Sequence, residues 1–563
     1  MGKASVQSKV EPFARRLILV LIGGLALARL APAALTDGPL VYAIKDARVV
    51  TVTNGTLAQG TVVVRDGLIE AVGERVDIPA DARIIDGSGL TVYPGLIDAH
   101  TDVAMEPPPP PAQPGRQQAG GGAPQQQTPA APAIKLGQNA DRLAADQLRP
   151  DESKLEKVRG MGVTTALTAP RTGIVQGQSA LINLAGEKPA KLIVKSPVAL
   201  HAKLGQDENF RTYPGSLMGV ISYLRQTLLD AQHYSLEQER YKRIQRGVPR
   251  PEPDPTMDAW QPILARQLPV VFLVDEAKEI QRIIKLAEEF NLKYIISGAS
   301  EGYEVAGLLR DKQIPVLVSL NFPTQPRDAD PEADVPLRVL RRRAEAPKTP
   351  ATLHQAGVKF AFTSGFMSEP GDFIRNAARA VKAGLPEEAA LKAMTINAAE
   401  IFGVAEQLGS VEAGKIANLV VTTGDLFNER TTIKHLFIDG REIELKKAPE
   451  RPERPEPDAR PTVMNVAGAW SLSVETPQGA VPVSATLQQT GTQITGMLSS
   501  MYGDNKAEGS ISGNRLRLKT QVNLDGQLTP VDFEATVEGT TMKGTVSVQG
   551  QGDFALTGTR PES

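Results

Sequence analysis

The alternation of apolar and polar positions divides the chain into three kinds of segment. Residues 41–98 and 404–447 contain short aliphatic and β-branched runs separated by turn dipeptides such as Asp66-Gly67 and Asp439-Gly440. Such dipeptides between apolar runs favour two-residue β-hairpins. Both segments are therefore predicted to be β-rich. We expect them to pair into one composite β-sandwich, although about 300 positions separate them.

Strand-like and helix-like patterns alternate from about residue 140 to residue 403. Val163–Thr168 and Pro269–Asp275 are apolar runs of strand length, and Ala277–Phe290 has apolar residues at helical spacing. This alternation predicts a parallel sheet with crossover helices. The run Leu90–His100 ends in polar residues, as does a buried strand that delivers side chains to the mouth of a barrel.

The last hundred residues have a different pattern, with strands separated by Gly, Asn and Asp turns. Val483–Leu487, Arg515–Val522 and Met542–Val548 are typical examples. Residues 466–563 are therefore predicted to form a separate antiparallel meander or small barrel. The Pro-, Glu- and Arg-rich stretch in 448–465 is typical of an extended linker.

Residues 106–133 are of low complexity, with runs of Pro, Gly and Gln. This composition cannot form a packed core, so we expect a long loop after the first barrel strand. That loop would lie on the face where barrel active sites occur.

Composition and the N-terminus limit the partners and the location. The formal net charge of −2 gives no electrostatic reason to expect nucleic acid as a partner, and the absence of cysteine excludes disulfides and thiolate ligands. Arg15-Arg16 precedes the apolar run Leu17–Leu30 and then small residues, which is typical of a secretory signal peptide over residues 1–34. We therefore expect a periplasmic or secreted protein with no stable membrane span after cleavage. An uncleaved anchor is the alternative.

Several motifs occur in an order that resembles the amidohydrolase superfamily, in its imidazolonepropionase-like branch. They are Tyr93-Pro-Gly-Leu-Ile-Asp-Ala-His-Thr-Asp102, Gly162–Pro170, Ala393–Gly403 and Gly409–Val420. The resemblance implies an α/β fold, a (β/α)₈ TIM barrel over residues 99–403, together with the composite β-sandwich. The C-terminal all-β domain is lipocalin-like. The implied activity is metal-dependent hydrolysis of carbon–nitrogen bonds other than peptide bonds.

Most of the metal positions that the resemblance implies hold other residues here. The family has a His-x-His pair after the first strand, and this chain has His100 and Asp102. His201 stands near the bridging-lysine position of the fourth strand, and the fifth strand ends in Asp275. The sixth strand lacks its histidine, and Gly365 stands where the eighth strand should supply an aspartate that acts as general base.

The remaining candidates define a weak, oxygen-rich metal site. Its ligands would be His100, Asp102, His201 and Asp275, and zinc is the metal that the resemblance implies, if any is bound. Tyr303, after the sixth strand, is a candidate substrate-binding residue, with core packing as the alternative. His233, His354 and His435 are expected to be structural or exposed.

Two functions follow from these observations. The first is an exported hydrolase with a largely degenerate metal site that acts on a small-molecule substrate. The second is a catalytically silent barrel that acts as a binding or partner subunit, for instance beside a homologous amidohydrolase chain. The fraction of divalent metal that co-purifies with the chain separates these two functions.

Overall fold

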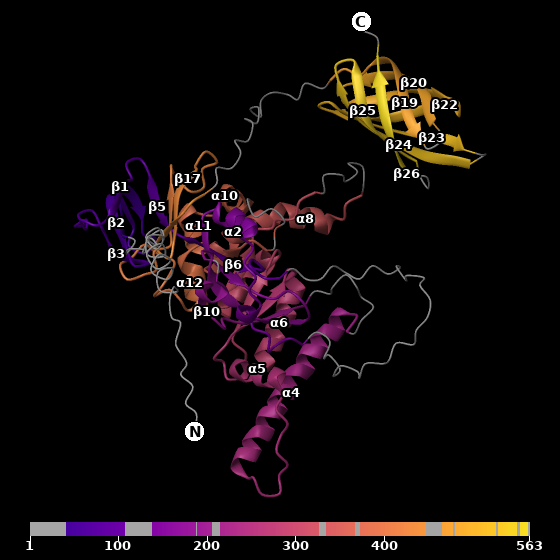
Figure 1. Cartoon of the computed structure of the whole chain (residues 1–563). Helices are drawn as coiled ribbons and strands as arrows, with labels where there is room; N and C mark the ends of the chain where they lie inside the picture. The colour runs from indigo at the N-terminus through magenta and orange to yellow at the C-terminus, as the bar shows by residue number, and fades with distance from the viewer. Residues whose placement is uncertain are drawn as a thin grey trace, which may run out of the picture. The chain divides into compact units, whose positions relative to one another are not determined.

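A computed structural model describes residues 41–106, 138–186, 188–204, 214–325, 334–365, 367, 372–445, 464–476, 479–524, 527–548 and 552–560. The chain forms two compact units, which divide at residues 446 and 447. The first unit contains a barrel and a β domain, and the second is all-β (Figure 1). The predicted signal peptide and most of the predicted low-complexity loop and linker lie outside the described residues.

The barrel wall is built from two hydrogen-bonded sheets. One has the order β10-β9-β7-β6, and the other has the order β15-β14-β13-β12-β11-β8. The strands from β11 to β15 are parallel in sequence order, as the alternating pattern predicted. The bounds are β6 Leu96–Thr101, β7 Val163–Thr168, β8 Val175–Gln178, β9 Ala180–Asn183, β10 Ile193–Lys195, β11 Leu200–Lys203, β12 Val270–Val274, β13 Tyr294–Gly298, β14 Val316–Ser319 and β15 Phe360–Thr363.

The third position of the wall departs from the predicted all-parallel arrangement. The strands β8 and β9 follow each other with only Ser179 between them. β9 pairs antiparallel with β7, and β8 pairs antiparallel with β11. The reason is the short connection after Thr168, which contains no helix, whereas parallel neighbours need a crossover of a dozen or more residues. The wall is therefore mixed at this one position.

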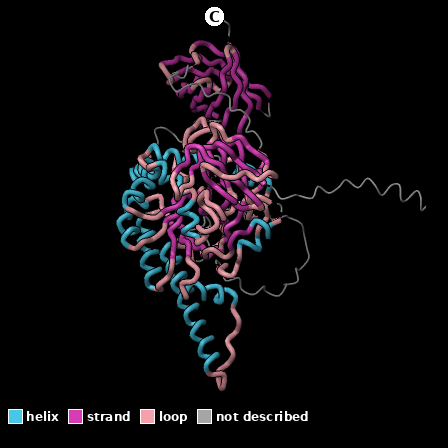
Figure 2. Tube along the Cα trace, turned by 90° about the vertical axis from the view of Figure 1, so that its left-hand side faces the viewer, coloured by secondary structure: helices cyan, strands magenta, loops and turns pink. Residues whose placement is uncertain are grey.

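Helices of the first unit pack around the wall. Their bounds are α2 Glu152–Arg159, α3 Pro189–Leu192, α4 Leu217–Arg243, α5 Pro255–Leu264, α6 Ala277–Glu289, α7 Ala306–Asp311, α8 Leu337–Glu345, α9 Thr349–Ala356, α10 Phe373–Lys382, α11 Glu387–Ala393 and α12 Ile396–Phe402, with short 3₁₀ turns η1 Ala144–Gln147, η2 Gly302–Val305 and η3 Ala346–Lys348. Helix α4 extends away from the barrel in both views (Figures 1 and 2). No helix in the described part of the chain is both long and apolar enough to span a membrane.

Residues 189–195 are divided between α3 and the short strand β10. Helices α11 and α12 are separated by a break at Met394 and Thr395. The helix α6 and the strand β7 agree with their predicted positions.

The β domain combines strands from both ends of the first unit. Its sheet has the order β18-β17-β16-β5-β1-β2-β3, and β4 also pairs with β1. The two chain segments join where β16 pairs antiparallel with β5, so that Val420 lies opposite Tyr93. The bounds are β1 Val41–Val50, β2 Thr56–Arg65, β3 Leu68–Gly73, β4 Arg83–Asp86, β5 Thr91–Pro94, β16 Leu419–Thr422, β17 Ile433–Ile438 and β18 Arg441–Ile443. The predicted pairing of distant segments is thus present, in one continuous sheet that shares one apolar core.

The two predicted hairpin turns have the backbone that their sequences favour. Asp66 and Gly67 both have positive φ, and so do Asp439 and Gly440. Two consecutive positive φ angles are typical of the type I′ turn, which joins antiparallel strands tightly. These turns set the register of β2 with β3 and of β17 with β18.

The side chain of Asn418 joins the β domain to the barrel. It is buried, and its amide nitrogen donates to Thr165 Oγ1 at 3.0 Å and to Asn183 Oδ1 at 2.9 Å. Its oxygen accepts from the Asp439 backbone N–H at 2.8 Å. One amide therefore satisfies buried polar groups on β7, on β9 and in the β17–β18 turn.

The second unit is a closed antiparallel barrel in which each strand pairs with the next and β19 pairs with β26. Its strands are β19 Gly468–Thr476, β20 Gly479–Thr490, β21 Gln493–Ser500, β22 Gly503–Ser512, β23 Arg515–Leu524, β24 Gln527–Glu538, β25 Thr541–Val548 and β26 Gly552–Thr559. Buried and exposed positions alternate along the strands, as expected when one face lines a core. Of the two predicted forms, meander and small barrel, the structure has the barrel.

We predict that Asn418→Ala destabilises the first unit by about 2–4 kcal/mol, because it leaves several buried polar groups without a partner at about 1–3 kcal/mol each. Denaturant unfolding of the full chain measures this loss. The matched control is Asn428→Ala, because Asn428 is exposed and its side-chain oxygen accepts from the Arg430 backbone N–H in its own turn. Equal effects of the two substitutions would show that Asn418 does not join the two parts.

Candidate active site at the barrel mouth

Two buried histidines lie next to each other inside the barrel, one near the C-terminal end of its strand and the other at the second position of its strand. His100 comes from β6 and His201 from β11, and their ring centroids lie 4.6 Å apart with the planes tilted by 52°. His100 Nδ1 is 2.8 Å from Ser297 Oγ on β13. Neither His201 ring nitrogen has a hydrogen-bond partner among the described residues. The structure therefore brings together two of the four predicted metal ligands.

Burial keeps both imidazoles neutral. His100 and His201 are 1% and 0% exposed. Burial lowers the pKa of His100 to about 4, a larger effect than the opposing effect of the Asp102 carboxylate. Burial also lowers the pKa of His201 well below its usual value, and the neighbouring His100 lowers it further. At neutral pH the pair therefore carries no charge, and its ring nitrogens keep their lone pairs.

A buried carboxyl group connects the first strand to the loop after the eighth. Asp98 Oδ1 accepts from the Ser364 N–H at 2.9 Å and from the His100 N–H at 3.3 Å. The Thr363 hydroxyl donates to the His100 carbonyl oxygen. Burial raises the pKa of Asp98 to about 6, although hydrogen bonds from Ser364 and His100 oppose the rise. These contacts hold β15 beside β6 and fix the backbone that carries His100.

The two predicted carboxylate ligands are occupied by other partners. Asp102 forms an ion pair with Arg171 at 2.9 Å. Asp275 accepts a hydrogen bond from the Ser300 hydroxyl, and Arg342 Nη2 lies 3.7 Å from its Oδ1. That Asp102 and Asp275 join His100 and His201 in one metal site stays a prediction. Among the described residues, no group of three or more His, Asp or Glu side chains is placed to hold a metal ion.

Glycines stand at the ends of the sixth and eighth strands, and a Cβ at either position would lie close to a neighbouring atom. A Cβ on Gly365, at the end of the eighth strand, would lie 1.9 Å from Ser319 Oγ. A Cβ on Gly298, at the end of the sixth strand, would lie 2.9 Å from the Val274 carbonyl oxygen. Both glycines also have positive φ, +59° and +97°, which other residues rarely adopt. The sixth and eighth strands therefore cannot present ligands from these positions.

The other histidines lie outside this site. The chain has five histidines, and all of them are described. His233 is exposed on α4 beside Glu237, His354 is exposed on α9, and His435 hydrogen-bonds Glu442 in the β domain. Any third ligand for His100 and His201 would therefore have to be something other than histidine or cysteine.

Tyr303 lies in the 3₁₀ turn η2 after the sixth strand, where it is partly buried. Burial raises its pKa, and the acidic side chains of Glu304 and Glu301 raise it further. Its surroundings are thus acidic, unlike those of the histidine pair. The predicted substrate-binding role of Tyr303 stays a prediction.

Sequence reasoning missed the groups that hold the histidine pair. Asp98 lies two residues before His100 in the motif, but its partner Ser364 lies 266 positions further on. Ser297 is adjacent to Gly298 at the end of the sixth strand, where the sequence lacks the expected histidine. Arg171, the partner of Asp102, follows the second strand directly. The types of these residues do not predict their pairings, because the partners come together only when the barrel closes.

The donor set does not fit the catalytic zinc of the family. Such a centre typically needs three protein ligands and an open position for water. The described mouth offers two imidazoles and two carboxylates that are already paired with arginines. The ring nitrogens of His201 have no hydrogen-bond partner among the described residues. One of them can serve as a metal ligand, but it does not complete a three-ligand centre.

Comparisons with known proteins agree with this fold. Residues 218–443 match the model of the Amidohydrolase family. A solved amidohydrolase from Thermotoga maritima is 26% identical, with a TM-score of 0.59, and the match covers 72% of this chain and all of that one. A dihydroorotase from Anaeromyxobacter dehalogenans is 42% identical over 60 residues, which are 11% of this chain and 14% of that protein. An imidazolonepropionase from Ralstonia nicotianae is 48% identical over 50 residues, which are 8% of this chain and 12% of that protein.

The barrel and its β domain have the fold of the solved amidohydrolase. Residues 218–443 form an amidohydrolase-family domain. The curated relatives are matched over only a small part of their length, so their activities are not transferred to this chain by the match alone.

We predict that His201→Leu stabilises the chain by about 1–2 kcal/mol at pH 7, because it removes a buried ring whose nitrogens lack partners. The gain should grow by about 1 kcal/mol between pH 7 and pH 5.5. The unfolded chain takes up a proton near pH 6.5 that the folded His201 excludes, so the wild type loses more stability on acidification than the variant, in which only His100 still has this effect. Denaturant unfolding with a chelator present measures both values.

The matched control is His233→Leu, because His233 is exposed on α4. Its effect on the free energy of unfolding should stay within about 0.5 kcal/mol. A loss of stability in His201→Leu that matches a large-to-small core substitution would contradict the view that His201 is an unsatisfied group.

Proposed function

We propose that this protein is an exported amidohydrolase-family member whose barrel mouth binds a ligand without the metal-activated hydrolysis that the fold usually supports. The observation that carries the proposal is the presence of glycine at positions 298 and 365, where an added Cβ would lie 2.9 Å from the Val274 carbonyl oxygen and 1.9 Å from Ser319 Oγ, respectively. In family members, a divalent metal lowers the pKa of a bound water, and an aspartate after the eighth strand acts as general base. Here Gly365 stands at the position of that aspartate.

The site that remains has a definite chemistry. His100 and His201 are neutral and buried, and His100 Nδ1 lies 2.8 Å from Ser297 Oγ. Such a pair can hydrogen-bond the polar group of a small uncharged molecule. Exclusion of water strengthens each of these bonds. The proposal therefore includes a small-molecule ligand at the mouth.

A hydrolase of carbon–nitrogen bonds is the second candidate, and the family relationship supports it. One observation of the structure favours it as well. Both nitrogens of His201 are buried without partners beside His100, and a divalent metal, with zinc the first choice, would satisfy them. His100 and His201 would then hold that metal, and Asp98, with its pKa near 6, is a buried carboxyl group close to His100 that can exchange a proton.

A homologous amidohydrolase chain is the partner we propose if the mouth is silent. In a symmetric dimer, both subunits use the same surface patch. A silent barrel that keeps this patch can bind an active relative in place of a second copy. Co-expression with such a relative tests this part of the proposal.

We predict that the purified full chain, equilibrated with Zn²⁺ and then dialysed, retains well under one zinc per chain. Turnover of simple linear and cyclic amides should be negligible, because loss of general-base catalysis alone removes about 10²–10⁴-fold in rate. Elemental analysis and product release measure the two quantities.

Residual zinc, if present, should disappear in His100→Ala and persist in His233→Ala, since His233 is exposed and distant in the fold. Stoichiometric zinc with clear turnover, both lost in His100→Ala, would contradict the non-hydrolytic proposal. It would establish the hydrolase candidate instead.

Export is the remaining part of the proposal, and it rests on residues 1–34 of the sequence. We predict that the mature protein begins close to Leu35 and occurs outside the cytoplasm. N-terminal sequencing of native protein after cell fractionation checks this. Native protein that retains residues before Arg15 would contradict the prediction.

A further inference from the structure

Helix α8 leaves its apolar side chains uncovered. It lies at the edge of the first unit (Figure 1), and none of its residues is buried. Leu337, Val339 and Leu340 are 70%, 38% and 47% exposed. None of the three packs against the hydrophobic core of the first unit.

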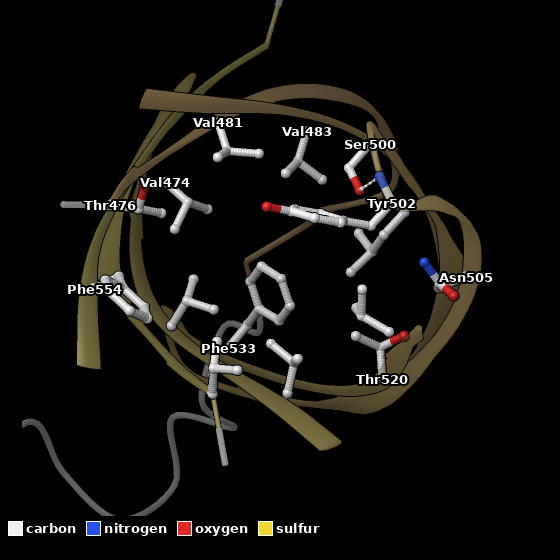
Figure 3. Close-up of a pocket in the computed structure, with 15 residues that line it drawn as sticks. Val474, Thr476, Val481, Val483, Ser500, Tyr502, Asn505, Thr520, Phe533 and Phe554 are labelled. Atoms are coloured by element: carbon white, nitrogen blue, oxygen red, sulfur yellow. Dashed lines mark hydrogen bonds between the residues drawn. The ribbon is translucent and has the colours of Figure 1, made fainter. Parts of the chain in front are cut away.

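Other elements of the chain turn their apolar faces inward. In α6, Ile280, Ile283 and Ile284 are buried in the core of the first unit. In the second unit, Figure 3 shows Val474 and Val483 pointing into the ring of strands. A surface helix of a globular protein normally directs its apolar stripe to the core in the same way as α6 does. Helix α8 departs from this rule.

Arginine side chains attach α8 to the barrel. Arg338 forms an ion pair with Glu276, and its Nε lies 3.6 Å from Glu301 Oε1. Arg342 Nη2 lies 3.7 Å from Asp275 Oδ1. These three carboxylates follow the strands β12 and β13, so α8 lies on the side of the barrel where the parallel strands end.

The helical periodicity places the apolar face away from these ion pairs. At about 3.6 residues per turn, Leu337, Leu340 and Ala344 fall within one arc of the helix. Arg338 and Arg342 fall on the roughly opposite side. Helix α8 therefore contacts the barrel through its polar face and presents its apolar face outward, which is the reverse of the usual arrangement.

Two further arginines flank the apolar face. At the same periodicity, Arg341 lies on one side of this face and Arg343 on the other. Neither has an ion pair with another described residue, whereas Arg338 and Arg342 do. The outward surface of α8 is thus apolar at its centre and positively charged along its edges. Guanidinium groups pair well with phosphate groups.

This pattern fits an anionic lipid surface better than a protein surface. Two leucines and a valine cover much less than the roughly 800 Å² that each partner of a stable protein complex buries. A bilayer needs no complementary shape. A helix with one apolar face and basic residues beside it lies in the interface, with the apolar side chains at the boundary between headgroups and acyl chains.

We propose that α8 docks this protein on an anionic phospholipid surface. Leu337 and Leu340 insert between the headgroups, and Arg341 and Arg343 pair with the phosphates. Docking turns the mouth side of the barrel toward the lipid. The proposal does not rest on the histidine pair or on the proposed function above.

A polarity-sensitive fluorophore on α8 tests the proposal in the full chain, since the sequence contains no other cysteine to label. On Leu340→Cys, its emission should shift to shorter wavelengths when vesicles of phosphatidylcholine and phosphatidylglycerol are added. Vesicles of phosphatidylcholine alone should have little effect, because the attraction of the arginines to anionic headgroups is then absent. About 1 M NaCl should suppress the shift, because it reduces the Debye length to about 3 Å.

The matched control carries the same fluorophore on Ile84→Cys. Ile84 is also aliphatic and is 60% exposed, but it lies in β4 of the β domain. Its emission should stay unchanged with either kind of vesicle. The fluorophore reports only on its own position, so binding through another part of the chain does not produce the shift at position 340.

Two substitutions in the chain labelled at position 340 separate the electrostatic and the apolar contributions. Arg341→Gln should weaken the affinity for anionic vesicles about fivefold. Leu337→Ser should weaken it about tenfold. Arg430→Gln is the matched control for the loss of charge, because Arg430 is exposed in the β domain, and it should have no effect. Both α8 side chains are exposed, so their substitution leaves the fold intact.

Three results would overturn the proposal. One is emission at position 340 that anionic vesicles do not change. The second is an equal shift at positions 340 and 84. The third is a shift at position 340 that appears without vesicles as the protein concentration rises, since a second copy of the chain would then cover α8.

Discussion

The packing of His100 against His201 is the contact on which the chemistry of the barrel mouth depends. Both rings are buried, and burial keeps them neutral. The neighbouring strands add Ser297 and a network around Asp98, and glycines stand at positions 298 and 365. Among the described residues, the donors that meet there are the two imidazoles.

Hydrogen bonds beside the histidine pair and at the β domain connect distant parts of the first unit. Asp98 and Thr363 join the first strand to the eighth, and Asn418 joins the barrel to the β domain. These are buried polar contacts between residues far apart in sequence. Buried polar networks are stabilising only when every member has its partner, which makes the unsatisfied His201 stand out. Groups of that kind are often retained for function at a cost in stability.

Local pattern was enough to predict most of the architecture. The hairpin turns at Asp66-Gly67 and Asp439-Gly440, the helix α6 and the strand β7 follow from residue types that act over a few positions. The antiparallel third position of the wall was not predicted, because it depends on the absence of a crossover after Thr168. Among the site residues, His100 and His201 were found from motif position, whereas the pairing of Asp102 with Arg171 and of Asp275 with Ser300 depends on tertiary contacts.

The most direct test of the central claim is anomalous diffraction at the zinc edge from crystals of the full chain soaked in Zn²⁺. We expect at most a partly occupied peak on the imidazoles of His100 and His201, with no third protein ligand. A fully occupied peak with three or more protein ligands at the barrel mouth would contradict the account. It would show that the chain completes a catalytic metal centre by a route that Gly298 and Gly365 do not block.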